Sequence, residues 1–155
     1  MYLNCHTYYS LRFGTFSEIE LLEMAQRSGV SQLALTDINN TSACLNFVRK
    51  APDYGIKPVL GIDFRKGAEQ LFIGLARNNK GFEELNAYLS HFSHKKQTLP
   101  DEAPFLENTF IIYPFEKVLL SEKTSFGPNE FIGISIENLR RLPFSKYRLD
   151  KERLV

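Results

Sequence analysis

The sequence predicts an α/β fold in which strands alternate with helices beside a largely parallel sheet. Short apolar runs bounded by turn residues alternate with segments that have the 3.6-residue spacing of amphipathic helices. This rhythm is typical of βαβ units. The 155 residues, of which 43% are apolar and 24% charged, are enough for one domain with a hydrophobic core.

The first half of the chain contains three predicted strands and two predicted helices. The strands are the apolar runs Tyr2–Cys5, Gln32–Thr36 and Lys57–Phe64. Ser17 and Glu20 match a capping box, which predicts that the first helix begins there. Asn40 or Thr41 is expected to cap the second helix, which Pro52 closes from behind.

The second half of the chain contains three more predicted strands. Leu71–Ala76 is expected to run antiparallel to its neighbour, and Asn78 leads into an amphipathic helix. The polar stretch Ser93–Pro104 is a predicted loop. Phe110–Tyr113 and Phe131–Ile134 follow as buried strands, and Ile136–Leu142 as a short helix.

Composition restricts the cellular context. Cys5 and Cys44 are too few for a disulfide framework and indicate buried thiols. No apolar run approaches the roughly 20 residues of a membrane span, and no signal peptide is recognisable, so we expect a cytoplasmic protein. The formal net charge of +1 creates no general field that would gather nucleic acid or anionic lipid.

Polar residues stand at the ends of the three predicted strands in the first half: His6, Asp37 and Asp63. Because ligands of α/β folds bind at the carboxyl ends of parallel strands, these side chains could meet around a divalent cation. The residues alone leave the alternative open. Asp37 could cap the following turn, and His6 could be a partly buried imidazole that bonds to the backbone.

Other polar groups favour simpler interpretations. His91 and His94 have helical i, i+3 spacing without accompanying carboxylates, which indicates a solvated helix end. Arg77 and Lys80 could form a modest basic rim, but the frame of a Walker phosphate loop is absent. DNA binding by the chain itself would need basic patches, of which the sequence offers Lys95-Lys96, Arg140-Arg141 and Lys151. The low net charge gives that reading little support.

Four stretches together resemble a known family: Asn4–Ser10, Ala34–Asn40, Lys57–Arg65 and Gly74–Phe82. They are similar to the N-terminal PHP domain (polymerase and histidinol phosphatase) of the alpha subunit of bacterial DNA polymerase III. The combination of T-D-x-x-N, K-P-x-x-G-x-x-F and L-A-x-N-N-x-G is typical of the polymerase branch, and the match extends over roughly the first 90 residues. The family fold is a distorted (β/α)7 barrel with metal ligands at the carboxyl ends of its strands. The resemblance implies that residues 1–155 are a truncated N-terminal portion of such a domain, without polymerase domains.

The chain departs from the family's metal-binding pattern at four positions. The first motif, H-x-H, is here Asn4-x-His6, and the second, Asp-His, is here Asp37-Ile38. The third usually ends in Glu, where this chain has Asp63. A histidine expected before the L-A-x-N-N motif is replaced by apolar Leu71 or a neighbour. Several clustered metal ions need more donors than these, so the resemblance implies a vestigial site at His6, Asp37 and Asp63. No cofactor is expected beyond, at most, a single cation of Zn, Mn or Mg.

The resemblance implies a catalytically silent module with structural and docking roles in DNA replication. Its expected partners are the remainder of the polymerase chain, a proofreading exonuclease subunit and, through the parent enzyme, DNA. No membrane contact is expected, and the fragment is expected to self-associate. The alternative is a metal-dependent phosphoesterase or 3′–5′ exonuclease with His6, Asp37 and Asp63 as direct metal ligands.

Overall fold

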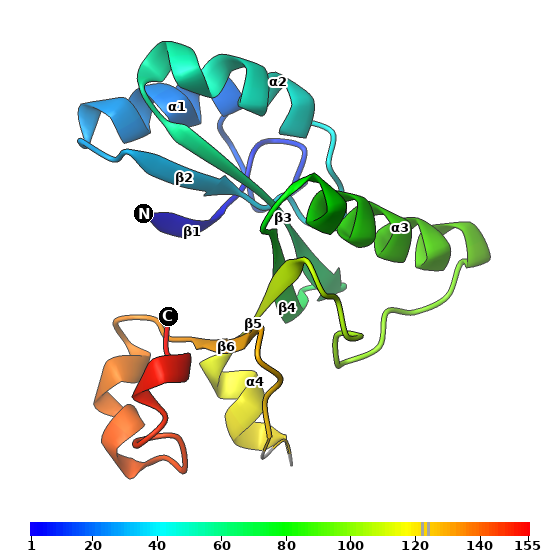
Figure 1. Ribbon diagram of the computed structural model, residues 1–155, viewed down its shortest axis with the longest axis vertical. Coiled ribbons are helices and arrows are strands. Elements are labelled where there is room, and N and C mark those ends of the chain that lie inside the picture. The colour runs from blue at the N-terminus through cyan, green and yellow to red at the C-terminus, as the bar shows by residue number, and fades with distance from the viewer. Residues whose placement is uncertain (122, 124) are drawn as a thin grey trace.

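The computed structural model describes residues 1–121, 123 and 125–155, and in this part of the chain six strands form one curled sheet (Figure 1). The strands lie side by side in chain order: β1 (Tyr2–Cys5), β2 (Gln32–Leu35), β3 (Lys57–Lys66), β4 (Glu69–Ala76), β5 (Thr109–Pro114) and β6 (Glu130–Gly133). β1, β2 and β3 are parallel, β4 is antiparallel to β3 and β5, and β6 is parallel to β5. The predicted α/β class and the antiparallel fourth strand are confirmed.

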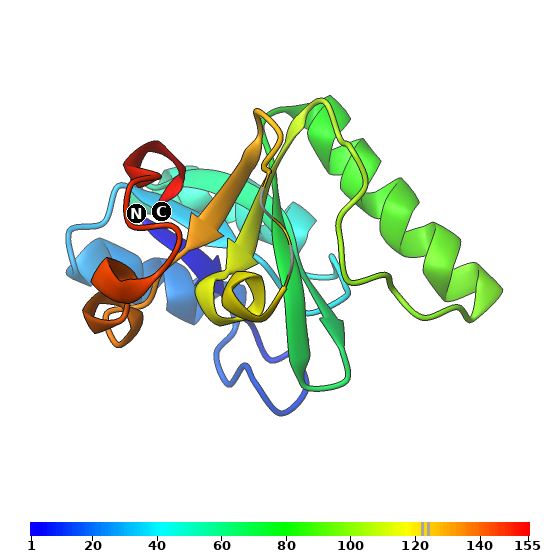
Figure 2. The same cartoon turned by 90° about the horizontal axis from the view of Figure 1, so that it is seen from below.

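Helices pack around this sheet, as the two views show (Figures 1 and 2). They are α1 (Glu18–Arg27), α2 (Cys44–Lys50), α3 (Asn79–Lys95) and α4 (Phe115–Leu120). Short 3₁₀ turns cover Ala51–Tyr54, Asn138–Arg140, Leu142–Phe144 and Lys151–Arg153. A hairpin joins β3 directly to β4 at Gly67, whose φ of 62° suits glycine, so the strict alternation of strands and helices is interrupted there.

Local capping explains where two of the helices begin. The capping box of α1 is present: the Glu20 N–H donates to Ser17 Oγ at 3.2 Å, and the Ser17 N–H donates to Glu20 Oε2 at 2.7 Å. Asn78 Oδ1 accepts from the Gly81 N–H at 3.0 Å and starts α3.

Several predicted boundaries are wrong. Neither Asn40 nor Thr41 caps α2, because the Asn40 Oδ1 accepts instead from the Ser42 N–H at 3.1 Å and the Thr41 hydroxyl donates to the side chain of Asn86 at 2.9 Å. The predicted loop from Ser93 begins later because α3 continues to Lys95, and the segment Ile136–Leu142 contains 3₁₀ turns instead of a helix. Asp63 does not stand near the end of its strand, because β3 continues beyond it to pair with β4.

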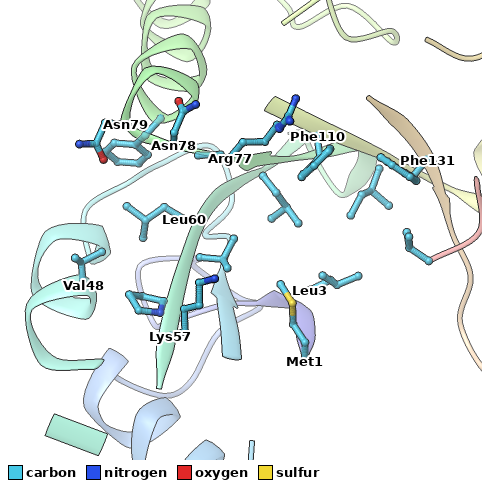
Figure 3. Close-up of a pocket in the computed structure, with 17 residues that line it drawn as sticks. Met1, Leu3, Val48, Lys57, Leu60, Arg77, Asn78, Asn79, Phe110 and Phe131 are labelled. Carbon is cyan, nitrogen blue, oxygen red and sulfur yellow. The ribbon is translucent and has the colours of Figure 1, made fainter. Parts of the chain in front are cut away.

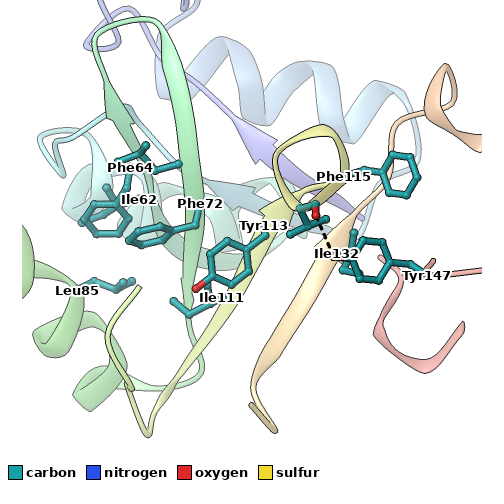
Figure 4. Close-up of a cluster of buried hydrophobic side chains, with 11 residues drawn as sticks. Ile62, Phe64, Phe72, Leu85, Ile111, Tyr113, Phe115, Ile132 and Tyr147 are labelled. Carbon is teal, nitrogen blue, oxygen red and sulfur yellow. Dashed lines mark hydrogen bonds between the residues drawn. The ribbon is translucent and has the colours of Figure 1, made fainter. Parts of the chain in front are cut away.

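Two apolar clusters fix the sheet against its helices. One cluster packs strands β1, β2 and β3 against α1 and α2, around Leu22, Leu35 and Phe47. The larger cluster joins β3–β6 to α3, α4 and the C-terminal turns through residues such as Phe72 and Tyr147 (Figure 4). In the described ranges no helix is long and apolar enough to span a membrane.

The two thiols differ in burial. Cys44 is fully buried, as predicted, and burial raises its pKa to about 12. Cys5 is only half-buried, and burial raises its pKa to about 11. Neither thiol is therefore ionised near neutral pH.

Candidate functional site

His6, Asp37 and Asp63 lie together where β1 and β2 end. After β2 the chain runs beside β3, so that the Asp63 N–H donates to the Asp37 carbonyl oxygen at 3.2 Å. His6 Nε2 lies 3.0 Å from Asp63 Oδ2. Both carboxylates are fully buried, and the His6 side chain is 14% exposed. Parallel strand order thus brings residues from three distant parts of the sequence to one edge.

Asp37 is surrounded by donors from the loop after β1. Its Oδ1 accepts from the Thr7 N–H at 2.7 Å and from the Ser10 hydroxyl at 2.6 Å, while its Oδ2 accepts from the Thr7 hydroxyl at 2.7 Å. Ser10 Oγ in turn accepts from the Ile38 N–H at 2.9 Å. Thr7 and Ser10 are themselves buried. The carboxylate therefore ties the loop after β1 to the loop after β2.

The negative charge of Asp63 is compensated by the guanidinium of Arg65. Its Oδ2 accepts from Arg65 Nη2 at 2.8 Å and from Arg65 Nε at 3.0 Å, in addition to the contact with His6. An ionised carboxylate oxygen can only accept, so this contact is a hydrogen bond when His6 carries its proton on Nε2. Asp63 Oδ1 is buried and has no hydrogen-bond partner among the described residues.

Three features hold Arg65 in this position. Residues 63 and 65 are two apart on β3, so their side chains leave the same face of the strand. Asn39 pairs with the Arg65 backbone: its Oδ1 accepts from the Arg65 N–H at 2.9 Å, and its Nδ2 donates to the Arg65 carbonyl oxygen at 2.8 Å. The guanidinium carbon lies 4.4 Å from the centre of the Phe13 ring, and the Arg65 side chain is only 11% exposed.

Asn4 and Ile38, which stand where the family pattern has histidines, both have structural partners. Asn4 Oδ1 accepts from the Thr36 hydroxyl at 2.8 Å, and Thr36 Oγ1 accepts from the Cys5 N–H at 3.1 Å, which links β1 to β2. Ile38 forms a parallel bridge to Asp63 through its backbone. Neither residue adds a metal donor to the site.

These residues do not fit a multi-metal centre. A divalent cation about 4 Å from the Arg65 guanidinium would be repelled by roughly 8 kcal/mol at an effective dielectric constant of about 20. Over residues 1–121, 123 and 125–155, no three side chains of His, Cys, Asp or Glu are grouped so that they could hold a metal ion. Asp63 Oδ1 is a buried acceptor without a hydrogen-bond partner in the described part of the chain, and one such oxygen suits a water molecule or a single weakly held cation.

Sequence reasoning missed the part that Arg65 plays. The residue falls inside a motif stretch, but a basic residue near a strand end reads as a solvated side chain. The available signal was the Asp-x-Arg spacing at the end of the predicted strand Lys57–Phe64, which places both charges on one face when the strand continues past Phe64. The partnership with Asn39 required the fold, since 26 positions separate the two residues.

The remaining candidate residues lie elsewhere. His91 and His94 are exposed towards the C-terminal end of α3, away from carboxylate partners among the described residues. Arg77 is exposed at the end of β4, where its guanidinium carbon lies 5.0 Å from the centre of the Phe110 ring. Lys80 is exposed in the first turn of α3. The basic residues Lys95, Lys96, Arg140, Arg141 and Lys151 are also exposed and sit on separate turns and helix ends.

A mostly apolar cavity of about 570 Å³ lies on the concave side of the sheet, as Figure 3 shows. It is lined near the beginnings of β1 and β3 by Leu3 and Leu60, and from β5 and β6 by Phe110 and Phe131. Asp63 is not among its lining residues. The cavity and the buried carboxylates are therefore separate features of the molecule.

Comparison with protein families finds that the PHP domain matches residues 3–123. DNA polymerase III subunit alpha of Ureaplasma parvum is 30% identical over 95 residues, which cover 61% of this chain and 10% of that protein. An error-prone DNA polymerase of Symbiobacterium thermophilum is 32% identical over 103 residues, or 64% of this chain and 9% of that protein. The chain thus spans about a tenth of the length of these curated relatives.

Two solved structures align with part of the chain. A protein described as a metal-dependent phosphoesterase from Bifidobacterium adolescentis aligns with a TM-score of 0.46 at 20% identity, over 60% of this chain and 33% of that one. An amidohydrolase from Chromobacterium violaceum, solved with sulfate and without metal, aligns with a TM-score of 0.48 at 23% identity, over 61% of this chain and 33% of that one.

Proposed function

Because the chain belongs to the PHP domain family, we propose that it is a catalytically silent PHP module of a bacterial DNA polymerase, with structural and docking roles in DNA replication. The observation that supports this most is the pairing of Asp63. One of its oxygens is already shared by Arg65 and His6, both from the chain itself. Asp37 likewise accepts three hydrogen bonds from Thr7 and Ser10.

The assignment to a polymerase is supported by the relatives. Several DNA polymerase III alpha subunits match 58–66% of the chain and are far longer than this sequence. The first partner of the module is then the remainder of a polymerase chain. A proofreading exonuclease subunit is the second, and DNA is reached through the parent enzyme.

The concave apolar face is the surface we assign to the remainder of the polymerase. Leu60, Phe110 and Phe131 line it, and the tenfold greater length of the relatives provides the chain that would cover it. Burying such side chains contributes about 25 cal/mol per Å² of apolar surface. The polymerase without this module, produced separately, should bind chain 1–155. The variant Phe131→Glu should bind far more weakly than the control Phe144→Glu, whose side chain is 91% exposed away from the cavity.

Metal analysis tests the silent state. We expect purified protein to contain less than stoichiometric Zn, Mn or Fe, and to show no hydrolysis of phosphodiesters or of DNA 3′ ends with added Mn²⁺. A full equivalent of metal that disappears in His6→Ala, together with hydrolysis, would establish the alternative function.

That alternative, a metal-dependent phosphoesterase or 3′–5′ exonuclease, has one observation in its favour. Asp63 Oδ1 is buried beside His6 and lacks a hydrogen-bond partner in the described part of the chain. A single cation at this oxygen is the form that the alternative would take here. It would lack the second and third ions that share charge in a multi-metal hydrolytic centre.

A further inference from the structure

We propose that the Arg65 guanidinium acts as a built-in replacement for a metal ion, supplying the positive charge that the buried Asp63 carboxylate needs. This inference rests on the proposed function, since it explains how a PHP site keeps its shape without metal. It concerns a residue that neither the sequence motifs nor the family match assigns to a role.

The need for a positive charge follows from burial. Asp63 is fully buried, and an ionised carboxylate in that environment must be paired. Arg65 approaches it with two nitrogen atoms, at 2.8 and 3.0 Å, and both reach the same oxygen that contacts His6. Asp63 Oδ2 therefore links β3 to the loop after β1, because it contacts both Arg65 and His6. A carboxylate bound to a metal ion would make the same kind of link through the ion.

The position of the guanidinium is fixed in advance. Asn39 adopts a left-handed conformation, with a φ of 49°, and pairs with both backbone groups of Arg65. Phe13 covers the guanidinium, and the next residue, Gly14, lies so close to the Thr7 carbonyl that a Cβ atom would be only 1.8 Å from its oxygen. The loop that carries Phe13 is therefore closely packed against the site.

The chemistry of the group distinguishes it from a bound ion. A guanidinium is permanently charged and covalently attached, so no chelator can remove it. Its planar set of N–H groups reaches one oxygen from two atoms, which a lysine ammonium cannot reproduce in the same way. The stability of the wild-type chain should accordingly be the same with EDTA, with Mn²⁺ and in plain buffer.

Thermal unfolding of Arg65→Met and of the control Arg49→Met, an exposed arginine on α2, tests the proposal. Arg65→Met leaves a buried charge without its partner, so its midpoint should fall by on the order of 10 °C, while the control should stay within about 2 °C. Saturating Mn²⁺ should raise the midpoint of Arg65→Met and leave the wild type unchanged. Equal midpoints for Arg65→Met and Arg49→Met would overturn the proposal, as would a failure of Mn²⁺ to stabilise Arg65→Met.

A second variant keeps the test decisive if Arg65→Met does not fold. In Asp63→Asn/Arg65→Met both charges are gone, so the double variant should be more stable than Arg65→Met and indifferent to Mn²⁺. A double variant no more stable than the single one would show that charge compensation is not what Arg65 provides. Failure of this inference can be told apart from failure of the proposed function. Stoichiometric metal and hydrolysis in the wild type would refute the silent module, whereas an inconsequential Arg65→Met would remove only the role of Arg65.

Discussion

The two buried carboxylates, Asp37 and Asp63, belong to neighbouring stretches of backbone but are stabilised by different means. Asp37 relies on three neutral donors, from the backbone and hydroxyl groups of Thr7 and Ser10, whereas Asp63 relies on a guanidinium and an imidazole. Neutral donors hold the charge by hydrogen bonds to its oxygens, and the guanidinium does so by direct compensation. The chain's own residues therefore hold both carboxylates, apart from Asp63 Oδ1, which has no hydrogen-bond partner among the described residues. Removing one contact at a time measures its contribution to stability.

The contact between Thr7 and Asp37 can be measured by removing one hydroxyl group. Thr7→Val keeps the shape of the side chain but leaves Asp37 Oδ2 without the donor 2.7 Å away. We expect the free energy of unfolding in urea to fall by about 1–3 kcal/mol, the cost of an unsatisfied buried acceptor. The exposed Thr98→Val is the matched control, and identical urea midpoints for the two variants would mean that this hydroxyl does not stabilise Asp37.

At this scale the sequence identified the acidic and imidazole groups but not their partners. His6, Asp37 and Asp63 could be found because each follows or lies within an apolar run. The donors Thr7 and Ser10 are ordinary loop residues in sequence, and only the fold shows that both point at a carboxylate about 30 positions away. Whether the three predicted residues bind metal stays a prediction.

At the scale of elements, helices with a local capping signal were predictable. α1 and α3 begin where Ser17 and Asn78 accept hydrogen bonds from the first turn, and such bonds depend on residues close in sequence. α2 has no side-chain cap, and α4 follows β5 directly at Pro114, so neither start carried a usable signal. Their positions depend on packing of Phe47 and Phe115 into the two clusters.

The attachment of α3 to β5 should depend on pH through Glu84. Burial alone would raise the pKa of this carboxyl, but hydrogen bonds donated by Asn108 and Thr109 outweigh it and hold the pKa below its ordinary value of 4.5. A lowered pKa in the folded state adds stability that is present above pH 4.5 and is lost as the pH falls through the folded value.

Glu84→Gln removes the titrating group and keeps the shape. The stability difference between wild type and Glu84→Gln should therefore be larger at pH 7 than at pH 3, as measured by urea unfolding at a series of pH values. Glu83→Gln, at an exposed neighbouring position, should show no such trend. Parallel profiles of unfolding free energy against pH for wild type and Glu84→Gln would contradict this account of how Glu84 attaches α3 to β5.

At the scale of the whole molecule, the rhythm of elements predicted the class of fold and part of the sheet order. β1, β2 and β3 pair in parallel because the connections that contain α1 and α2 carry the chain back to the end of the sheet where the previous strand began. The antiparallel direction of β4 was predicted, but the curl of the sheet and the continuation of β3 beyond Phe64 were not, since they depend on contacts such as the close approach of Gly61 to Gly74. A Cβ atom at Gly61 would lie 2.3 Å from the Gly74 carbonyl oxygen.

The curl leaves an apolar concave face that is open in the isolated chain. Phe110 and Phe131 pack edge to face there, with ring centres 5.6 Å apart, beside Leu3 and Leu60. Apolar surface of this kind favours association when its natural cover is absent. We therefore expect the isolated chain to self-associate through this face, with a mass in sedimentation that rises with protein concentration.

Substitution of Phe131 distinguishes self-association through the concave face from nonspecific association. Phe131→Glu places a charge in the cavity, so its self-association should weaken at least tenfold, because burying an unpaired carboxylate opposes any apolar partner. Phe144→Glu removes a more exposed aromatic ring outside the cavity and should associate like the wild type. A compact monomer at high concentration for the wild type would contradict the prediction. Equal weakening by the two substitutions would instead place the contact outside the concave face, and the same face could then no longer be assigned to the remainder of a polymerase.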